Sequence, residues 1–316
     1  MSTRFRYTLH QLRIFHAVVD NGGVTRAAQA LHLTQPTVSM QIRQLNESLG
    51  VALLEPRGRA LRLTPAGREA LEFAKAMLRS AESLSERLAA LEGLARGRLR
   101  LAAASTAEYF VPRLLGAFQQ AHPGVAVELK VVNRAEVVSR LRDDADDLYV
   151  MAQPPSEEPA VAHAFLDNPL VVIALATHPL AARRKIPLAA LAGHEFVVRE
   201  PGAGTRLVAD TFLAARGITL ATRLELGSNE AVKQAVIGGL GLAVISLHAL
   251  RDELLHHRRL RVLRVDGFPI RGRWHCVRRA DRAPTRIANA FQSFVSAAAP
   301  GLAGELARLI AVRPTR

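Results

Sequence analysis

The sequence predicts an α+β protein in which a small helical head, one long helix and a larger α/β part follow one another. Three observations predict this order. Residues 1–64 carry short apolar repeats of helical period followed by a basic hairpin, residues 65–96 carry a heptad-spaced apolar seam, and residues 97–300 alternate strand-like and helix-like segments. A chain of 316 residues is also too long for one ordinary core, so more than one domain is expected.

The composition is that of a globular protein with a basic excess. Apolar residues make up 49% of the chain and charged residues 22%, which excludes an intrinsically disordered polymer. With 42 Lys and Arg against 28 Asp and Glu, the formal net charge is +14. This excess suits a polyanionic partner such as DNA. An arginine-rich, alanine-rich bias also reflects genome base composition, so charge alone leaves both interpretations open.

Cysteine usage and the lack of long apolar stretches bear on the cellular location. Cys276 is the only cysteine, so no intrachain disulfide can form, and a reducing compartment is expected. Its strand-like, apolar surroundings favour a buried structural thiol over a reactive one. Residues 1–7 lack the apolar core of a signal peptide, and no apolar stretch is long enough to span a bilayer. We expect a cytoplasmic protein with no membrane partner.

The head is expected to contain three short helices and a hairpin. Asn-Gly-Gly at 21–23 ends the first helix, and 24–31 forms an alanine-rich second helix. Thr34 has the character of an N-cap for the third helix, which tolerates Pro36 in its first turn and ends near Gly50. The basic segment Glu-Pro-Arg-Gly-Arg at 55–59 then forms the tip of the hairpin.

A heptad seam follows in the long helix from Pro65. Its apolar residues are separated alternately by four and three positions: Ala70, Ala74, Met77, Ala81, Leu84, Leu88 and Leu91. Such a seam needs a partner helix, so the spacing predicts a dimerisation helix. The alternative is a helix packed on its own domain.

The C-terminal part alternates strands and helices. Strands are expected at 99–103, 125–131, 148–151, 170–176, 195–199, 242–245 and 274–277. Helices are expected at 110–121, 135–141, 205–216, 232–237 and 287–298. This alternation predicts mostly parallel sheets covered by helices. Residues 160–163 are expected to lie in a loop.

The third helix presents a face without acidic residues. Two helices separated by a short turn, with Ala27 and Ala28 at their crossing, can pack closely at a steep angle. The second of them exposes short polar groups and Arg43, and Glu47 is the first acid after Asp20. Such groups can reach base edges in a major groove, while an arginine suits guanine or a phosphate. An ordinary solvated helix face is the alternative, but it would normally carry acids too.

These motifs resemble LysR-type transcriptional regulators, and the resemblance runs over nearly the whole chain. It rests on Leu-Arg-Ile-Phe at 12–15, on the segment 25–50, and on Leu-Arg-Leu-Thr-Pro-Ala-Gly at 61–67. The turn at 22–25 departs slightly from the family's usual Gly-Ser-Phe.

The resemblance implies a winged helix-turn-helix, a linker helix and a two-lobed α/β effector-binding domain resembling periplasmic binding proteins. The implied bounds are 1–64 for the DNA-binding domain, 65–96 for the dimerisation helix, 97–300 for the effector-binding domain and 301–316 for a C-terminal tail. Within the effector-binding domain, lobe I would comprise about 97–168 and 270–300, and lobe II about 169–269. The expected DNA contacts are Arg26, Thr34, Gln35, Pro36, Thr37, Ser39, Met40 and Arg43, with Arg57 and Arg59 in the wing.

Three segments are expected to face a cleft between the two lobes, where such folds bind ligands. Hydroxyls and backbone N–H groups at a helix start suit an anion, and so does a glycine-rich turn carrying a hydroxyl and a guanidinium. Helix capping and a merely structural turn are the alternatives, and the glycine run at 238–241 favours close helix–strand packing. The expected effector-binding residues are Ser105, Thr106, Gln153, Gly202, Gly204, Thr205, Arg206, Asn229 and Glu230.

Within the family, the chain most resembles regulators of Calvin-cycle (RuBisCO) operons, on the segments 148–155, 200–206 and 226–234. This implies a phosphorylated, carboxylate or nucleotide effector of carbon fixation, with no cofactor and no metal. It also implies a dimer of dimers on an interrupted palindrome of double-stranded DNA, with RNA polymerase as a further partner.

Two rival classes are weighed against a regulator. An enzyme would need a catalytic constellation, and neither the histidines, including His256 and His257, nor the carboxylates show one. A solute-binding protein would share the two-lobed fold. It would, however, carry an export signal and no DNA-binding head.

Overall fold

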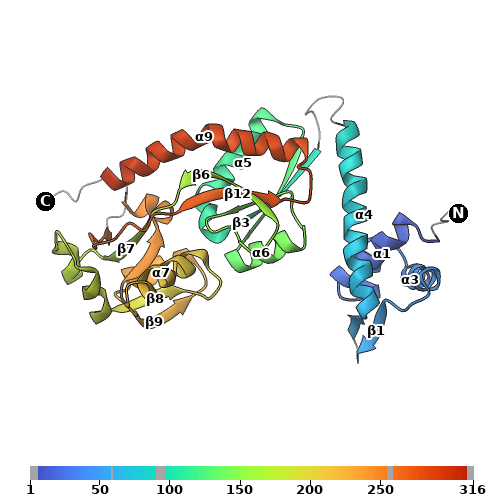
Figure 1. The fold of residues 1–316 in the computed structure, drawn as a ribbon, viewed down its shortest axis with the longest axis horizontal. Helices are drawn as coiled ribbons and strands as arrows, with labels where there is room; N and C mark the ends of the chain where they lie inside the picture. The colour runs from blue at the N-terminus through green and yellow to red at the C-terminus, as the bar shows by residue number, and fades with distance from the viewer. Residues whose placement is uncertain (1–5, 58–59, 90–96, 255–258, 312–316) are drawn as a thin grey trace. The chain divides into compact units, whose positions relative to one another are not determined.

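The computed structural model describes residues 6–57, 60–89, 97–254 and 259–311. The chain divides into two compact units, Met1–Leu91 and Glu92–Arg316, which are described here one by one (Figure 1). The predicted order of a helical head, a long helix and an α/β part is confirmed. In the described ranges, every helix is too short or too polar to cross a bilayer.

Three helices form the head, and local sequence signals set their ends. They are α1 (Leu9–Asp20), α2 (Val24–Ala30) and α3 (Gln35–Leu49). A capping box between Thr8 and Gln11 starts α1. Thr34 caps α3, and Gly50 ends it in the left-handed conformation with φ 73°, as the sequence predicts.

The hairpin packs beside these helices and leads into α4. Its antiparallel strands are β1 (Leu54–Arg57) and β2 (Ala60–Leu63), and α4 spans Pro65–Ala89. The apolar seam of α4 is buried in one part and exposed in another. Ala74 is fully buried in the core of the head, so this part of the seam packs on its own domain.

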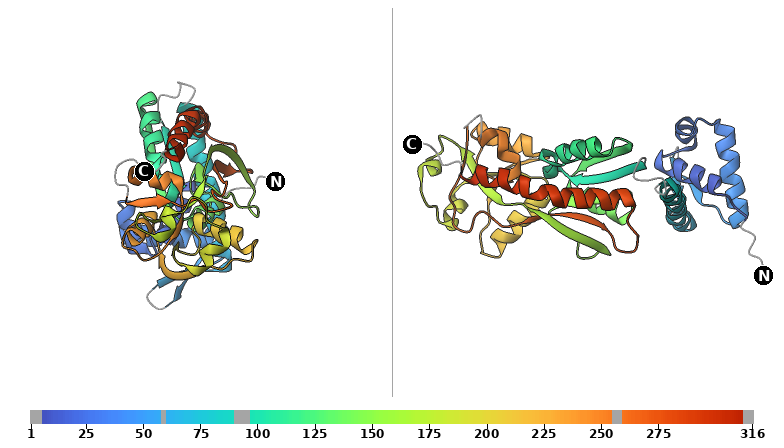
Figure 2. Two further views of the ribbon diagram at one scale, coloured as in Figure 1. Left: turned by 90° about the vertical axis from the view of Figure 1, so that its left-hand side faces the viewer. Right: turned by 90° about the horizontal axis from the view of Figure 1, so that it is seen from above.

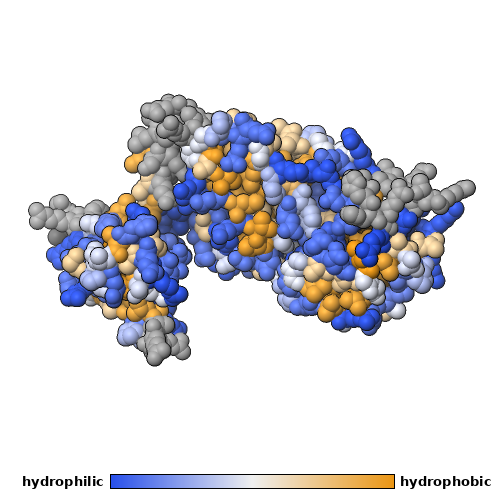
Figure 3. Space-filling model, turned by 180° about the vertical axis from the view of Figure 1, so that it is seen from behind, coloured by the Kyte–Doolittle hydropathy of each residue, from blue (hydrophilic) through white to orange (hydrophobic). Residues whose placement is uncertain are grey.

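Other apolar side chains of α4, next to Ala74 and beyond it, face solvent. Phe73, Met77 and Leu84 are 42%, 38% and 52% exposed. Figure 3 shows apolar surface along this helix. This surface is available to a partner helix, whereas the N-terminal part of the seam is already occupied.

Lobe I of the larger unit is built on a five-stranded sheet of order β4-β3-β5-β12-β6. Its strands are β3 (Gly97–Ala104), β4 (Val125–Val132), β5 (Leu148–Met151), β6 (Ala160–Asp167) and β12 (Arg273–Arg279). Its helices are α5 (Val111–Ala121), α6 (Arg134–Arg142) and the start of α9 (Arg286–Ala311). In Figure 1, α5 and α9 lie on one side of the sheet and α6 on the other.

Two expectations about this sheet are wrong. The sheet is mixed, because β3, β4 and β5 are parallel whereas β12 runs antiparallel to both β5 and β6. Residues 160–163, expected in a loop, belong to β6 and pair with β12. The strand escaped notice because it is rich in alanine, which is depleted in strands, and because His163 interrupts its apolar residues.

Lobe II holds two smaller sheets. β7 (Leu170–Leu175) lies between β10 (Ala243–Ser246) and β11 (Leu260–Val262) and is antiparallel to both. β8 (Glu195–Arg199) and β9 (Ala221–Leu226) are parallel. The helices α7 (Gly204–Ala214) and α8 (Asn229–Ile237) pack against these strands.

The last helix spans both lobes. We expected a helix ending at 298 and a tail from 301, but α9 continues through Pro300 to Ala311. Phe291 and Val295 are buried in the core of lobe I, and Leu306 is buried in the core of lobe II. Figure 2 shows α9 running along the unit. Burial of this apolar face offsets the cost of an internal proline, about 3 kcal/mol.

The glycine run at 238–241 provides close packing, as the sequence favours. Gly241 has φ 140°, and a Cβ there would lie 2.5 Å from the backbone oxygen of Glu195. Gly241→Ala should therefore lower the free energy of unfolding by about 1–3 kcal/mol, measured by urea denaturation. Gly116→Ala in α5 is the control, because nothing lies within 4 Å of its Cβ and alanine favours a helix by about 0.5–1 kcal/mol. Equal effects of the two substitutions would contradict this account.

Candidate DNA interface and effector cleft

The N-terminus of α3 carries most of the residues expected to contact DNA. The side-chain oxygen of Thr34 accepts a hydrogen bond from the backbone N–H of Thr37 at 3.3 Å, and their hydroxyl oxygens lie 2.8 Å apart. Thr34 is therefore a helix cap whose hydroxyl is already engaged. The remaining predicted residues of α3 are exposed or half-buried: Gln35, Pro36, Thr37, Ser39, Met40 and Arg43.

The other predicted DNA contacts lie outside α3. Arg26 is exposed, and its guanidinium donates to the backbone oxygen of Gly22 at 2.8 Å, which ties α2 to the preceding turn. Arg57 ends β1. Its side chain and the whole of Arg59 lie outside the described residues.

A cavity lies between the lobes, beyond the ends of β3 and β5. Five residues named from the sequence line it: Ser105, Thr106, Gln153, Gly204 and Thr205. Gly204 and Thr205 are the first residues of α7, so the positive end of that helix borders the cavity. The water-accessible volume is only about 20 Å³, which is room for about one water molecule. The structure is thus a closed form of the cleft.

Arg134, at the start of α6, is the charged residue that lines this cavity. Its Nε donates to the backbone oxygen of Gln153 at 2.9 Å. Within the described ranges no carboxylate forms a salt bridge with it, and burial lowers the pKa of its guanidinium. A half-buried cation without a carboxylate partner favours an anionic ligand.

Arg199 joins the two lobes behind the cavity. It is 3% exposed, and Glu200 holds its guanidinium through two oxygens at 2.7 and 2.9 Å. The same guanidinium donates to Oδ1 of Asn229 at 2.7 Å and to the hydroxyl of Ser105 at 3.1 Å. Asn229 in turn donates to the hydroxyl of Thr106 at 3.0 Å. Both hydroxyls belong to lobe I, so these bonds hold the cleft shut.

Four predicted effector-binding residues do not line the cavity: Gly202, Arg206, Asn229 and Glu230. Gly202 meets α6, because the backbone N–H of Ala135 donates to its oxygen at 3.1 Å. Arg206 pairs with Asp210 and lies 3.7 Å from Glu225.

Glu230 belongs to a charged group beside the lobe contact. It lies 2.8 Å from Nζ of Lys233, and this ion pair lowers its pKa. Lys233 is buried, pairs with Glu253 as well, and sits over the ring of Tyr109 from lobe I.

Sequence reasoning missed Arg134, Arg199, Asn168 and Trp274. Arg199 offers a signal, since it is a charge that ends an apolar strand. Trp274 is the only tryptophan in the chain. Asn168 lines the cavity and accepts a hydrogen bond from the hydroxyl of Ser246 at 2.6 Å. Arg134 and Asn168 carry no local signal, because their contacts come from neighbours that are distant in sequence.

An aromatic group lies next to the cavity. The ring of Trp274 lies 5.3 Å from Phe110, and the ring of His248 from lobe II lies 5.3 Å from the same phenylalanine. His248 Nε2 lies 2.8 Å from the backbone oxygen of Asp167. Burial is the main cause that lowers the pKa of His248, so its imidazole is neutral at neutral pH.

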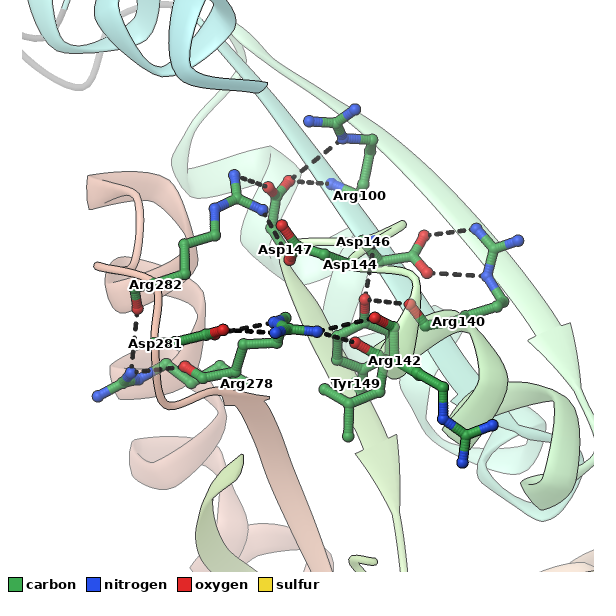
Figure 4. Close-up of polar contacts among 12 residues, drawn as sticks. Arg100, Arg140, Arg142, Asp144, Asp146, Asp147, Tyr149, Arg278, Asp281 and Arg282 are labelled. Atoms are coloured by element: carbon green, nitrogen blue, oxygen red, sulfur yellow. Dashed lines mark hydrogen bonds and ion pairs between the residues drawn. The ribbon is translucent and has the colours of Figure 1, made fainter. Parts of the chain in front are cut away.

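A second polar cluster lies at the other end of the lobe I strands (Figure 4). Asp147, which precedes β5, accepts from the backbone N–H of Arg100 at 2.8 Å and from Arg282 at 3.3 Å. Asp146 accepts two hydrogen bonds from Arg140, both at 2.8 Å. The ion pairs of this cluster secure lobe I where the chain enters β3. Arg278 differs from the other arginines, because it donates to the backbone oxygens of Arg279 and Arg282 at 3.0 and 3.4 Å.

Cys276 lies in β12 and is buried, which confirms the expected environment of the thiol. Burial raises its pKa to about 12. Among the residues described, no group of His, Cys, Asp and Glu side chains is arranged to hold a metal ion.

Comparison with known proteins gives matches over both units. Residues 9–68 match the family described as "Bacterial regulatory helix-turn-helix protein, lysR family", and residues 92–300 match the "LysR substrate binding domain". The RuBisCO operon transcriptional regulator of Allochromatium vinosum is 47% identical over 288 residues, which is 91% of this chain and 95% of that protein.

Two solved structures are also similar. The regulatory domain of CcmR from Synechocystis PCC6803, in complex with 2-PG, has a TM-score of 0.63 and 44% identity, covering 65% of this chain and 98% of that chain. A full-length OxyR from Pseudomonas aeruginosa has a TM-score of 0.73 and 23% identity, covering 91% of this chain and 94% of that chain. The second likeness shows the fold alone.

The half-buried, neutral His248 predicts a loss of stability in acid. A histidine whose folded pKa lies below its unfolded value near 6.5 stabilises the fold above that value, and the contribution disappears as pH falls through it, by at most about 1.4 kcal/mol per pH unit. Thermal unfolding of the effector unit between pH 7.5 and 5.5 should show a smaller pH dependence in His248→Gln. The exposed His163→Gln is the control and should keep the dependence of the unmodified protein. An unchanged slope in His248→Gln would contradict the assignment.

Proposed function

Because this chain belongs to the LysR family of bacterial transcriptional regulators, we propose that it controls carbon-fixation genes and responds to a small anion bound in its interlobe cleft. The family consists of transcription regulators rather than enzymes. The carbon-fixation role is supported by the Allochromatium protein, a RuBisCO operon regulator with 47% identity. The CcmR regulatory domain, 44% identical and bound to 2-PG, supports a small-molecule effector in this type of domain.

The proposal for DNA is that the exposed start of α3 reads base edges in a major groove. Support comes from its position at a helix N-terminus, from the absence of acids between Asp20 and Glu47, and from the exposure of Gln35 and Arg43. Thr34 then acts mainly as the helix cap. Arg26 combines a structural bond with a phosphate contact, and the wing arginines Arg57 and Arg59 reach the backbone or minor groove.

For the effector, the observation that carries the proposal is the guanidinium of Arg134 in the cavity wall, which has no carboxylate partner in the described part of the chain. An anion would be held between Arg134 and the N-terminus of α7, at Gly204 and Thr205. Ser105, Thr106, Asn229 and Arg199 serve the same site by holding the lobes together. An effector that binds only between closed lobes stabilises the closed arrangement over an open one and thereby shifts the population.

The assembly is proposed to be a dimer of dimers on an interrupted palindrome, acting on RNA polymerase in the cytoplasm. The exposed apolar side chains Phe73, Met77 and Leu84 on α4 support pairing of linker helices. Effector-dependent closure would change the relation between the dimers and the bend of the DNA.

Arg43→Ala tests the DNA proposal in an electrophoretic mobility shift assay on the upstream promoter and on random DNA. Loss of a base contact should weaken binding to the promoter by about 1–3 kcal/mol more than binding to random DNA. Arg223→Ala, which removes one charge from an exposed ion pair in lobe II, should leave both affinities unchanged. If Arg43→Ala weakens both DNAs equally, Arg43 contacts phosphate and does not read bases.

Arg134→Gln and Arg206→Gln form a matched pair for the effector proposal. Isothermal titration of the full chain with 2-PG, phosphoenolpyruvate, ribulose 5-phosphate and NADPH should identify at least one binding anion. Its affinity should fall by about 10- to 100-fold in Arg134→Gln, because a charge-assisted bond is worth about 1.5–3 kcal/mol. Arg206→Gln, whose guanidinium is committed to Asp210 and Glu225, should bind as the unmodified protein does. If Arg206→Gln weakened binding and Arg134→Gln did not, the anion would be bound by Arg206 and not by Arg134. If none of the four anions bound, this class of effector would be excluded.

A further inference from the structure

Two buried polar atoms in the cavity wall have no hydrogen-bond partner among the described residues. One is the indole Nε1 of Trp274, a residue that is 1% exposed, and the other is the side-chain oxygen of Gln153. Buried polar groups in folded proteins are almost always paired. Leaving such groups unpaired destabilises the fold, so two of them in one small cavity point to a ligand that pairs with them.

The two atoms need opposite kinds of hydrogen-bond partner. The indole N–H can only donate, so it needs an acceptor, and the Gln153 oxygen can only accept, so it needs a donor. Fully ionised phosphate and carboxylate groups bring acceptors alone. Such an anion would satisfy Arg134 and Trp274 but would leave the oxygen of Gln153 unpaired. A hydroxyl group supplies a donor as well as acceptor capacity.

Both side chains are held in place by their surroundings. Trp274 packs edge-on against Phe110, with ring centroids 5.3 Å apart. The backbone oxygen of Gln153 accepts from Arg134, and its side-chain oxygen would lie 2.9 Å from a Cβ on Gly204. The unpaired acceptor therefore lies beside the glycine that begins α7, next to the proposed anion position. This places a hydroxyl-recognising acceptor close to the group that holds the charge.

We propose that the side-chain oxygen of Gln153 accepts from a hydroxyl group of the effector while the indole of Trp274 donates to its anionic group, so that the protein selects hydroxylated anions, such as phosphorylated sugars or phosphorylated hydroxy acids, over anions without a hydroxyl. The inference rests on the proposed function, because it uses the same cavity and the same Arg134. It goes further by naming the chemical class that the cavity discriminates. An analogue that lacks the hydroxyl leaves a buried acceptor unpaired and is rejected for that reason.

The test compares two probes that differ in one hydroxyl: 3-phosphoglycerate and its 2-deoxy analogue, 3-phosphonooxypropanoate. Isothermal titration of the full chain should give at least about tenfold tighter binding of 3-phosphoglycerate. In Gln153→Met, which keeps the length of the side chain and removes the acceptor, the ratio should fall to nearly one. Trp274→Phe, which keeps an aromatic ring and removes the donor, should weaken both probes together.

The unfolding temperature of the ligand-free variant shows whether a loss of binding comes from misfolding. Replacing an unpaired buried group by an apolar one of similar shape is neutral or stabilising, so the ligand-free Gln153→Met protein should unfold at the same temperature as the unmodified protein or higher. A lower unfolding temperature would show that the amide is paired in solution and would overturn the inference.

The remaining outcomes separate this inference from the proposed function. If both probes bind equally, or if the preference persists in Gln153→Met, the hydroxyl inference is wrong although an effect of Arg134→Gln would still uphold the anion site. If neither phosphorylated probe binds, the inference is overturned for this class. If the unmodified protein did not bind the promoter, the proposed function itself would be wrong.

Discussion

The closed cleft depends on one buried arginine. Arg199 ends β8 in lobe II, yet its guanidinium reaches the hydroxyl of Ser105 in lobe I. A buried cation is tolerated only when it is paired and hydrogen-bonded, and Glu200 and Asn229 supply these partners from its own lobe. The charge is therefore neutralised locally, and the bond across the cleft is left to a neutral hydroxyl. Such a contact can break and reform without exposing an uncompensated charge, which suits a cleft that must open for its ligand.

The helix α9 constrains how that opening can happen. It contributes Phe291 to the core of lobe I and Leu306 to the core of lobe II, so it passes from one lobe to the other as a single element. The chain also passes between the lobes at two other places. One is the segment from Asp167 to Leu170, and the other is the segment from Ile270 to Arg273. A motion of the lobes has to be absorbed by these few connections. His248 contacts the backbone oxygen of Asp167, and Trp274 lines the cavity directly after Arg273, so both lie beside these connections.

The arginines of the effector unit have different roles that composition cannot distinguish, and Arg199, which joins the lobes, is only one of them. Arg100 and Arg282 of the cluster in Figure 4 neutralise a buried aspartate and secure the start of β3. Arg206 is paired on the surface of α7. Arg134 alone lines the cavity without a carboxylate partner in the described part of the chain. The net charge of +14 therefore does not identify the ligand. A single guanidinium that lines a cavity without a carboxylate partner favours an anion.

Local chemistry alone was enough to predict the head, because caps, turns and helical periods act over a few residues: Thr34 begins α3 and Gly50 ends it. Motif resemblance likewise located five of the cavity residues, since the ends of β3 and β5 and the start of α7 carry recognisable turns. The mixed sheet, the strand β6 and the full length of α9 needed the folded chain, because pairing with β12 and burial of Leu306 decide them. The same holds for Arg199 and Ser105, which are 94 residues apart. Contacts of that range leave no periodic trace in a sequence, and only tertiary packing brings them together.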